Sequence, residues 1–182
     1  VAVLGAGTMG RGIAQVAATS GFTTRLYDVD GDVLAAGDAG SRAGIARLES
    51  KGKLDAAAAA AARERLRALP DLTSAVTGAD LVIEAIPERL DWKRELYARV
   101  EPLLSPSALL ASNTSSLPIR QLALQLARPE RFLGLHFFNP VPVMRLLEIV
   151  VGPRTAPAAV DAARSLADRL GKDAIVVNDS PG

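Results

Sequence analysis

The only histidine of the chain, His136, is the residue best suited to proton transfer near neutral pH. Twelve residues later, Glu148 stands in the apolar run 146–150, where burying an unpaired carboxylate would be costly. Its partner is either Arg145 or His136. If the turn between them reverses the chain, Glu148 returns beside His136 and can fix the tautomer of the imidazole and stabilise its protonated form. A structural Glu–Arg pair is the alternative.

A glycine-rich motif near the start of the chain could bind a phosphate group. Gly5, Gly7 and Gly10 form a G-x-G-x-x-G pattern, with Thr8 and Met9 between the last two glycines. The first glycine permits a tight turn, the second lets the backbone approach a pyrophosphate, and the third lets the next helix pack closely. Asp28 would accept hydrogen bonds from ribose hydroxyls and repel a 2′-phosphate, so the pattern predicts NAD rather than NADP. A structural turn with a helix-capping aspartate is the alternative.

Two further groups of polar residues follow apolar runs. The cluster 112–116 reads Ser-Asn-Thr-Ser-Ser and comes directly after a predicted strand. It can cap the helix that follows, supply hydrogen-bonding groups at the edge where a cofactor would bind, or do both at once. Glu84 lies near the end of the apolar run 81–85, and Glu88 and Lys93 follow that run. From their spacing alone, these three charges fit the solvated N-terminus of a helix.

The elements that must position these residues alternate along the chain. Apolar runs predict strands at 1–4, 23–27, 81–85, 108–111, 132–137, 146–151 and 174–177. Amphipathic patterns predict helices at 8–20, 90–104, 117–126 and 156–170, and two helices between 29 and 69 that join near 51–53. Asp55 is a plausible N-cap of the second of these two helices. The order indicates a Rossmann-type doubly wound α/β fold with a mainly parallel sheet and a projecting helical hairpin.

Composition excludes several classes of protein. The chain has 182 residues, a formal net charge of +1 and no cysteine. The length fits one domain, and the lack of cysteine excludes a disulfide scaffold or a thiolate metal site. We therefore expect no metal, and the near-neutral charge argues against nucleic acid as a partner. No apolar stretch reaches the length of a membrane span, and no signal peptide is visible, so we expect a cytoplasmic protein without membrane contact.

Four segments together resemble the NAD-binding domain of the L-3-hydroxyacyl-CoA dehydrogenase family, including its bacterial 3-hydroxybutyryl-CoA dehydrogenases. They are the stretches 3–10, 82–88, 111–117 and 136–144. The Ser-Asn-Thr-Ser-Ser and His-Phe-Phe-Asn-Pro blocks carry the resemblance more specifically than the glycine motif does. The terminal Asp-Ser-Pro-Gly also matches, so the resemblance covers the whole chain.

The resemblance implies oxidation of the 3-hydroxyl of an (S)-3-hydroxyacyl-CoA by NAD, within fatty acid metabolism and β-oxidation. His136 would be the catalytic base, Glu148 would orient it, and Ser115 would hydrogen-bond the reacting oxygen and touch the nicotinamide ribose. The remaining positions that match cofactor contacts of the family are Glu88, Lys93, Asn113 and Asn139.

The resemblance also implies partners beyond this chain. Lys51 and Lys53 are loose candidates for contacts with the coenzyme A of the substrate, on a hairpin that is alanine-rich and differs in length from that of the family. We expect residues 1–182 to form the NAD-binding domain and a helical dimerisation domain to follow it. The chain by itself is then expected to be inactive and the full protein to be a homodimer. The alternatives are a dehydrogenase of a free hydroxy acid or sugar acid, and an NAD-binding module without catalysis.

Overall fold

The apolar runs of the chain form one eight-stranded sheet. The structure is a computed structural model that describes residues 1–180, and the last two residues of the expected Asp-Ser-Pro-Gly junction lie outside the described part. The strand order is β3-β2-β1-β4-β5-β6-β7-β8. The bounds are β1 Ala2–Leu4, β2 Thr24–Tyr27, β3 Leu66–Ala68, β4 Leu81–Glu84, β5 Leu109–Ser112, β6 Phe132–Phe137, β7 Leu146–Val151 and β8 Asp173–Asn178. Among the strands of residues 1–180, only the β6–β7 pair is antiparallel, which confirms the predicted doubly wound, mainly parallel sheet.

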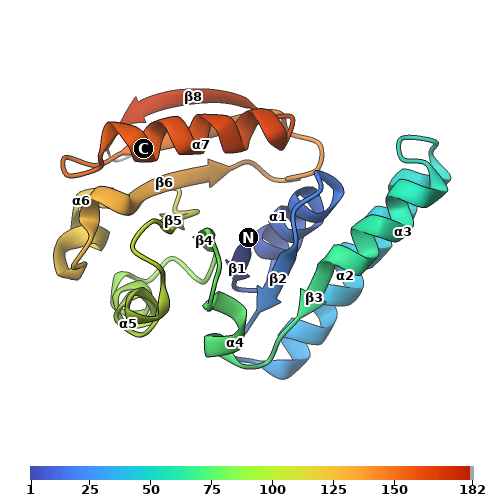
Figure 1. Ribbon diagram of the computed structural model, residues 1–182, viewed down its shortest axis with the longest axis horizontal. Helices are drawn as coiled ribbons and strands as arrows, with labels where there is room; N and C mark the ends of the chain where they lie inside the picture. Colours follow the sequence, from blue (N-terminus) through green and yellow to red (C-terminus); the bar gives the residue numbers. More distant parts are fainter. Residues whose placement is uncertain (181–182) are drawn as a thin grey trace.

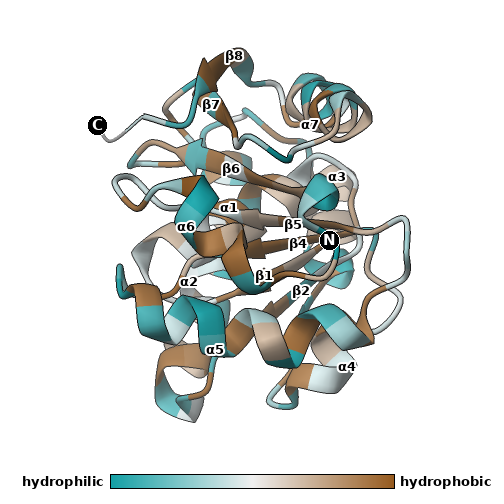
Figure 2. Cartoon of the chain, turned by 90° about the vertical axis from the view of Figure 1, so that its left-hand side faces the viewer, coloured by the Kyte–Doolittle hydropathy of each residue, from teal (hydrophilic) through white to brown (hydrophobic). Residues whose placement is uncertain are grey.

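Helices cover both faces of this sheet, as the parallel pairing requires. They are α1 Thr8–Thr19, α2 Gly31–Ser50, α3 Ala56–Arg65, α4 Leu72–Val76, α5 Leu90–Val100, α6 Ile119–Leu122 and α7 Pro157–Arg169. One apolar cluster lies between the sheet and α1, α2, α3 and α7, and a second lies between the sheet and α4, α5 and α6. Figure 2 shows the apolar strands at the centre and the polar residues on the outer sides of the helices.

The two long helices after β2 form the expected hairpin. Asp30 caps α2 by accepting hydrogen bonds from the backbone N–H groups of residues 32 and 33, and Asp55 caps α3 in the same way. Figure 1 shows α2 and α3 side by side, with their connecting turn at the upper right. Ala59 and Ala62 are fully buried, so the alanine-rich sequence lets α3 pack closely on its neighbours.

Several expected helices end earlier than the sequence patterns predict, and the one expected at 90–104 ends at Val100, where a 3-10 turn at Glu101–Leu103 follows. The residues 66–68, expected to be helical, form β3 instead and pair in parallel with β2, because the edge of β2 offers backbone hydrogen bonds there. The helix expected at 117–126 is shorter: it consists of α6 followed by a 3-10 turn at Ala123–Gln125. Pro129 follows shortly after, and the backbone conformation of Arg128 before it is not helical.

The antiparallel pair β6–β7 sets the register of the most distinctive residues. Gly134 lies opposite Val150, and His136 lies opposite Glu148. A side chain on an antiparallel strand meets the one directly opposite on the same face of the sheet. The reversal of the chain between these strands therefore places both side chains together. Within residues 1–180, no helix is long and apolar enough to cross a membrane.

Candidate functional site

The carboxyl ends of β1, β4, β5 and β6 meet at one edge of the sheet. The glycine motif follows β1, residues 85–89 follow β4, residues 113–117 follow β5, and the turn 138–145 follows β6. The connections from β1 lead to β2 on one side, and the chain later returns to β4 on the other side. In open α/β sheets, ligands bind at such a reversal of strand order, so the sequence-predicted residues gather where a ligand site is expected.

The glycine motif has the geometry that a pyrophosphate site needs. Gly5 has a φ of 101°, and a Cβ there would lie 2.6 Å from the carbonyl oxygen of Ala85. A Cβ on Gly10 would overlap the carbonyl oxygen of Gly5, whereas one on Gly7 would meet open space. Gly7 precedes α1 and provides no side-chain cap, so the first N–H groups of the helix can bind an anion.

Asp28 lies at the end of β2 and lines the same cavity as the glycine motif. Its Oδ2 accepts a hydrogen bond from the N–H of Ala6 at 2.7 Å, and its Oδ1 accepts one from the N–H of Asp30 at 3.0 Å. Asp30, not Asp28, caps α2, so the alternative of a helix-capping role for Asp28 is wrong. One carboxylate is thus placed where ribose hydroxyls are expected to bind.

The cavity beside Asp28 suits the adenosine half of NAD. Its volume is about 670 Å³, within the range of small-molecule sites. Its walls combine the glycine motif with apolar side chains from β2, α2, the segment after β4 and α5. The lining residues are Gly5, Gly7, Thr8, Met9, Tyr27, Asp28, Val29, Val33, Ala85, Ile86, Pro87, Trp92, Glu95, Leu96 and Arg99. A largely apolar cavity with a carboxylate and free helical N–H groups fits the parts of this cofactor.

His136 and Glu148 are in direct contact. The His136 Nδ1 lies 2.8 Å from the Glu148 Oε2, and both side chains are partly buried. Arg145, the other possible partner of Glu148, instead binds Asp173 through two hydrogen bonds of 2.7 and 2.8 Å. Because an ionised carboxylate only accepts hydrogen bonds, this contact places the proton on Nδ1 and leaves Nε2 able to accept one.

The polar loop after β5 connects two strand ends. Asn113 donates its backbone N–H to the carbonyl of Glu84, and its Oδ1 accepts a hydrogen bond from the N–H of Phe137, next to His136. Ser115 is exposed on this loop. The first N–H groups of α6 are bound by the carboxylate of Asp179, so the predicted capping role of the cluster 112–116 is filled from the far end of the chain.

Two of these three charges, Glu84 at the end of β4 and Lys93 on α5, are buried, contrary to the simplest interpretation of their spacing, whereas Glu88 is exposed. Lys93 and Glu84 are buried, and the Lys93 Nζ binds Glu84 at 2.7 Å and Glu88 at 3.1 Å. Tyr97 and Ser112 complete the group by donating hydrogen bonds to the other oxygen of Glu84. Tyr97 was not identified from the sequence, although it lies four positions after Lys93 and so shares its helix face, whereas Ser112 is the first residue of the polar cluster 112–116.

Glu88 predicts a pH-dependent contribution to stability. Burial alone would raise its pKa, but the hydrogen bond from Thr114 and the ammonium of Lys93 lower the pKa from 4.5 to about 2. A lowered folded-state pKa stabilises the fold above the unfolded value, and this stabilisation is lost as the pH falls toward about 2. The stability lost on Glu88→Gln should therefore be largest near neutral pH and shrink below 4.5. Urea unfolding of both proteins at several pH values tests this, and a constant difference would contradict it.

The remaining predicted contacts, Asn139 to the cofactor and Lys51 and Lys53 to the substrate, lie in two places. Asn139 lines a cavity of about 280 Å³ between α1, α2 and the turn after β6, together with Thr8, Arg11 and Arg47. The two arginines were not identified from the sequence, where nothing distinguishes them from ordinary surface charges. Lys51 and Lys53 are exposed at the connecting turn of the hairpin and are not among the residues that line this cavity.

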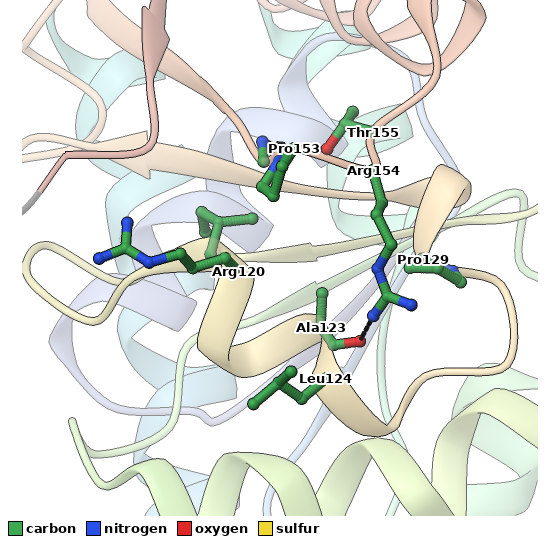
Figure 3. Close-up of a pocket in the computed structure, with 9 residues that line it drawn as sticks. Arg120, Ala123, Leu124, Pro129, Pro153, Arg154 and Thr155 are labelled. Atoms are coloured by element: carbon green, nitrogen blue, oxygen red, sulfur yellow. Dashed lines mark hydrogen bonds between the residues drawn. The ribbon is translucent and has the colours of Figure 1, made fainter.

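A separate small cavity lies between α6 and the segment that follows β7 (Figure 3). Its volume is about 210 Å³. One of its two arginines, Arg154, donates a hydrogen bond to the carbonyl of Ala123 at 2.5 Å, as Figure 3 shows. None of the residues predicted from the sequence to contact cofactor or substrate lines it, so it lies apart from the candidate site.

Comparisons with known proteins agree over the whole described chain. Residues 1–180 match the family model described as 3-hydroxyacyl-CoA dehydrogenase, NAD binding domain. The chain is 42% identical to a probable 3-hydroxybutyryl-CoA dehydrogenase of Bacillus subtilis, covering all of this chain and 63% of that protein. It is also 42% identical to the 3-hydroxyadipyl-CoA dehydrogenase of Escherichia coli, covering all of this chain and 38% of that protein. The chain thus spans less than two thirds of the length of these relatives.

Solved structures give the same result. The crystal structure of 3-hydroxybutyryl-CoA dehydrogenase from Escherichia coli has a TM-score of 0.95 at 40% identity, covering 100% of this chain and 39% of that one. A diketoreductase, described as acting on dicarbonyl compounds, has a TM-score of 0.91 at 34% identity, covering 99% of this chain and 64% of that one. The fold is therefore shared by proteins whose substrates differ.

Proposed function

Because the chain belongs to the 3-hydroxyacyl-CoA dehydrogenase family, as its NAD-binding domain, we propose that it serves the oxidation of an (S)-3-hydroxyacyl-CoA to the 3-oxoacyl-CoA. The contact of 2.8 Å between His136 and Glu148, at the same edge of the sheet as the glycine motif, is the observation that carries this proposal. An imidazole held by a carboxylate at the edge of the sheet where a dinucleotide is expected to bind can take the proton of an alcohol as the cofactor takes its hydride.

His136 removes the proton of the 3-hydroxyl in this proposal. NAD, when bound, supplies the acceptor for the hydride from C3. The unprotonated Nε2 of His136 takes the hydroxyl proton, and the negative charge of Glu148 stabilises the imidazolium that results. In the reverse direction, the same protonated imidazole returns the proton to the oxygen as a general acid.

Ser115 and the residues around it complete the proposed site. The Ser115 hydroxyl, on the exposed loop after β5, hydrogen-bonds the reacting oxygen and so orients the hydroxyl toward His136. Asn113 supports this geometry, because its side chain binds the backbone next to His136 at 2.9 Å. Glu88, Lys93 and Asn139 remain predicted cofactor contacts, and Lys51 and Lys53 remain predicted contacts of coenzyme A.

The substrate class is tested by comparing turnover of two substrates by the full-length protein. We expect NAD-dependent oxidation of 3-hydroxybutyryl-CoA and a kcat/KM lower by at least about 100-fold for free 3-hydroxybutyrate, which lacks the binding energy of coenzyme A. The similarity to a diketoreductase, described as acting on dicarbonyl compounds, supports a second candidate, a dehydrogenase of a free hydroxy acid or sugar acid. Faster turnover of the free acid would favour that candidate, and NAD binding without any turnover would favour a non-catalytic module.

Asp28 should set the preference for NAD over NADP. Asp28→Asn keeps an oxygen that accepts from Ala6 but removes the charge that repels a 2′-phosphate. We expect the ratio of NAD to NADP affinity to fall by about tenfold or more, measured by calorimetric titration. Asp30→Asn is the matched control, since asparagine caps a helix as well as aspartate does and the charge lies two residues further on. An equal effect of both substitutions would contradict the assignment.

We further propose that a second, helical domain follows this one and forms a homodimer, since the relatives are longer than the chain. This domain would close over the substrate and complete catalysis. Light scattering of the full-length protein tests the dimer, and a monomeric mass at micromolar concentration would contradict it. A place in β-oxidation and a cytoplasmic location stay predictions.

A further inference from the structure

Lys93 is a buried ammonium shared by two carboxylates. Its side chain is 1% exposed, and its Nζ lies 2.7 Å from Glu84 and 3.1 Å from Glu88. Glu84 is fully buried, whereas the side chain of Glu88 is 34% exposed. Burying a charge is costly unless it is paired and hydrogen-bonded. The ammonium of Lys93 therefore links the partly exposed carboxylate of Glu88 to the buried carboxylate of Glu84.

Glu84 is fixed because its oxygens are bound by groups of the core. Tyr97 and Ser112 donate hydrogen bonds of 2.6 and 2.7 Å to Oε2, and the N–H of Ile86 donates one of 2.8 Å to Oε1. Burial and the Glu84 carboxylate raise the pKa of Tyr97 well above its ordinary value, so its hydroxyl stays a donor. The aromatic ring of Tyr97 also packs against Phe132 at 5.3 Å between centroids.

Glu88 in turn holds the loop that carries Ser115. Its Oε1 accepts hydrogen bonds from the N–H groups of Ser115 and Ser116 at 2.9 and 3.2 Å. The hydroxyls of Thr114 and Ser116 donate to the same oxygen. Neither Glu88 nor this loop belongs to a helix or strand. The carboxylate is thus the link between the loop and the buried ammonium.

We propose that Lys93 is a positioning residue that acts through Glu88 on Ser115 and sets the place of the Ser115 hydroxyl at the reacting oxygen. This inference rests on the proposed function, in which Ser115 contacts that oxygen. The path runs from the core at Glu84, through the ammonium of Lys93 and the carboxylate of Glu88, to the backbone N–H of Ser115. A displacement of about 1 Å at such a group can lower kcat by about 100-fold.

A double-mutant cycle in the full-length protein tests the path. We expect Lys93→Met to lower kcat at saturating NAD by about 10- to 100-fold in the wild-type background. In the Ser115→Ala background, the same substitution should lower kcat by less than about twofold, because the group that Lys93 positions is gone. Equal effects in both backgrounds would overturn the proposal, since general loss of structure acts independently of Ser115.

Amide hydrogen exchange supplies a test that does not depend on activity. We expect the protection of the Ser115 and Ser116 amides to fall by about tenfold or more in Lys93→Met, while that of Phe137, bound to Asn113, stays unchanged. Unchanged protection at residues 115 and 116 would overturn the proposal. A wild-type protein that did not oxidise the coenzyme A thioester would contradict the proposed function. The exchange measurement would still show whether Lys93 positions the Ser115 loop.

Two further variants keep the test decisive if Lys93→Met does not fold. Glu88→Gln breaks the same link from the other side, because its amide cannot both accept from the loop and pair with the ammonium, so the same non-additivity with Ser115→Ala is expected. Tyr97→Phe is the matched control: it removes a hydrogen bond to Glu84 but leaves the ring and the Lys93–Glu88 pair in place. Tyr97→Phe should lower the free energy of unfolding without altering the exchange protection of the Ser115 amide. A selective loss of that protection would overturn the proposed path.

Discussion

Replacing His136 by glutamine is expected to lower kcat for oxidation of 3-hydroxybutyryl-CoA by about 1,000-fold and to leave the KM for NAD unchanged. The imidazole is the only group of its kind in the chain, and its Nε2 is left free by the 2.8 Å contact of Nδ1 with Glu148. Glutamine fills a similar volume but cannot take a proton at neutral pH. Steady-state kinetics of the full-length protein measure both constants.

Two companion variants separate proton transfer from general damage to the strands. Glu148→Gln should also lower kcat by at least about 100-fold, since a neutral amide no longer stabilises the imidazolium. Arg145→Gln is the control: it breaks an exposed ion pair with Asp173 near the same strand end and should leave kcat unchanged. A His136→Gln protein that keeps more than a tenth of the wild-type kcat would exclude His136 as the base.

The second large effect concerns two glycines that are three residues apart. Gly7→Ala should lower the affinity for NAD by about 100-fold or more, which corresponds to about 2.7 kcal/mol. The φ of Gly7 is −65°, which alanine adopts readily, and its new Cβ would meet no protein atom within 4 Å. The methyl group would instead occupy the space that the pyrophosphate needs. The free energy of unfolding should change by less than about 1 kcal/mol.

Gly10→Ala should lower both binding and stability. Its Cβ would overlap the carbonyl oxygen of Gly5 and lie 2.8 Å from the carbonyl carbon, so α1 has to move away from the turn. We expect a loss of about 2 kcal/mol or more in the free energy of unfolding. Calorimetric titration with NAD and urea unfolding, applied to both variants, measure the two quantities. Equal stability losses in the two variants would contradict the assignment of separate roles.

The positions of His136 and Glu148 could be predicted because both residues lie on strongly apolar strands. The bounds of β6 and β7 match the apolar runs at 132–137 and 146–151 residue for residue. Spacing alone left two partners open for Glu148, because sequence does not reveal how the intervening turn closes. In the structure, the register of β6 and β7 pairs Glu148 with His136, and Arg145 instead binds Asp173 on β8.

Long-range contacts were not predictable from local patterns. Leu66 and its neighbours follow an arginine-rich helix end and carry no strand signal, and they become β3 only because β2 offers an open edge. Asp179 caps α6 across 60 residues of sequence. Glu84 resembles any charge after a strand, and its burial depends on partners supplied by α5 and β5.

The direct pairing of His136 with Glu148 also determines which changes of length the site tolerates. Their alignment is set by the backbone ladder between β6 and β7, not by the turn 138–145 that joins them. Residues could be added to or removed from this turn while the ladder keeps the two side chains together. A single residue inserted within β7 between Glu148 and Val150, which lies opposite Gly134, would shift Glu148 by one position in the register and send its carboxylate to the opposite face of the sheet. Insertions and deletions here should therefore be accepted in the turn and rejected in the strands.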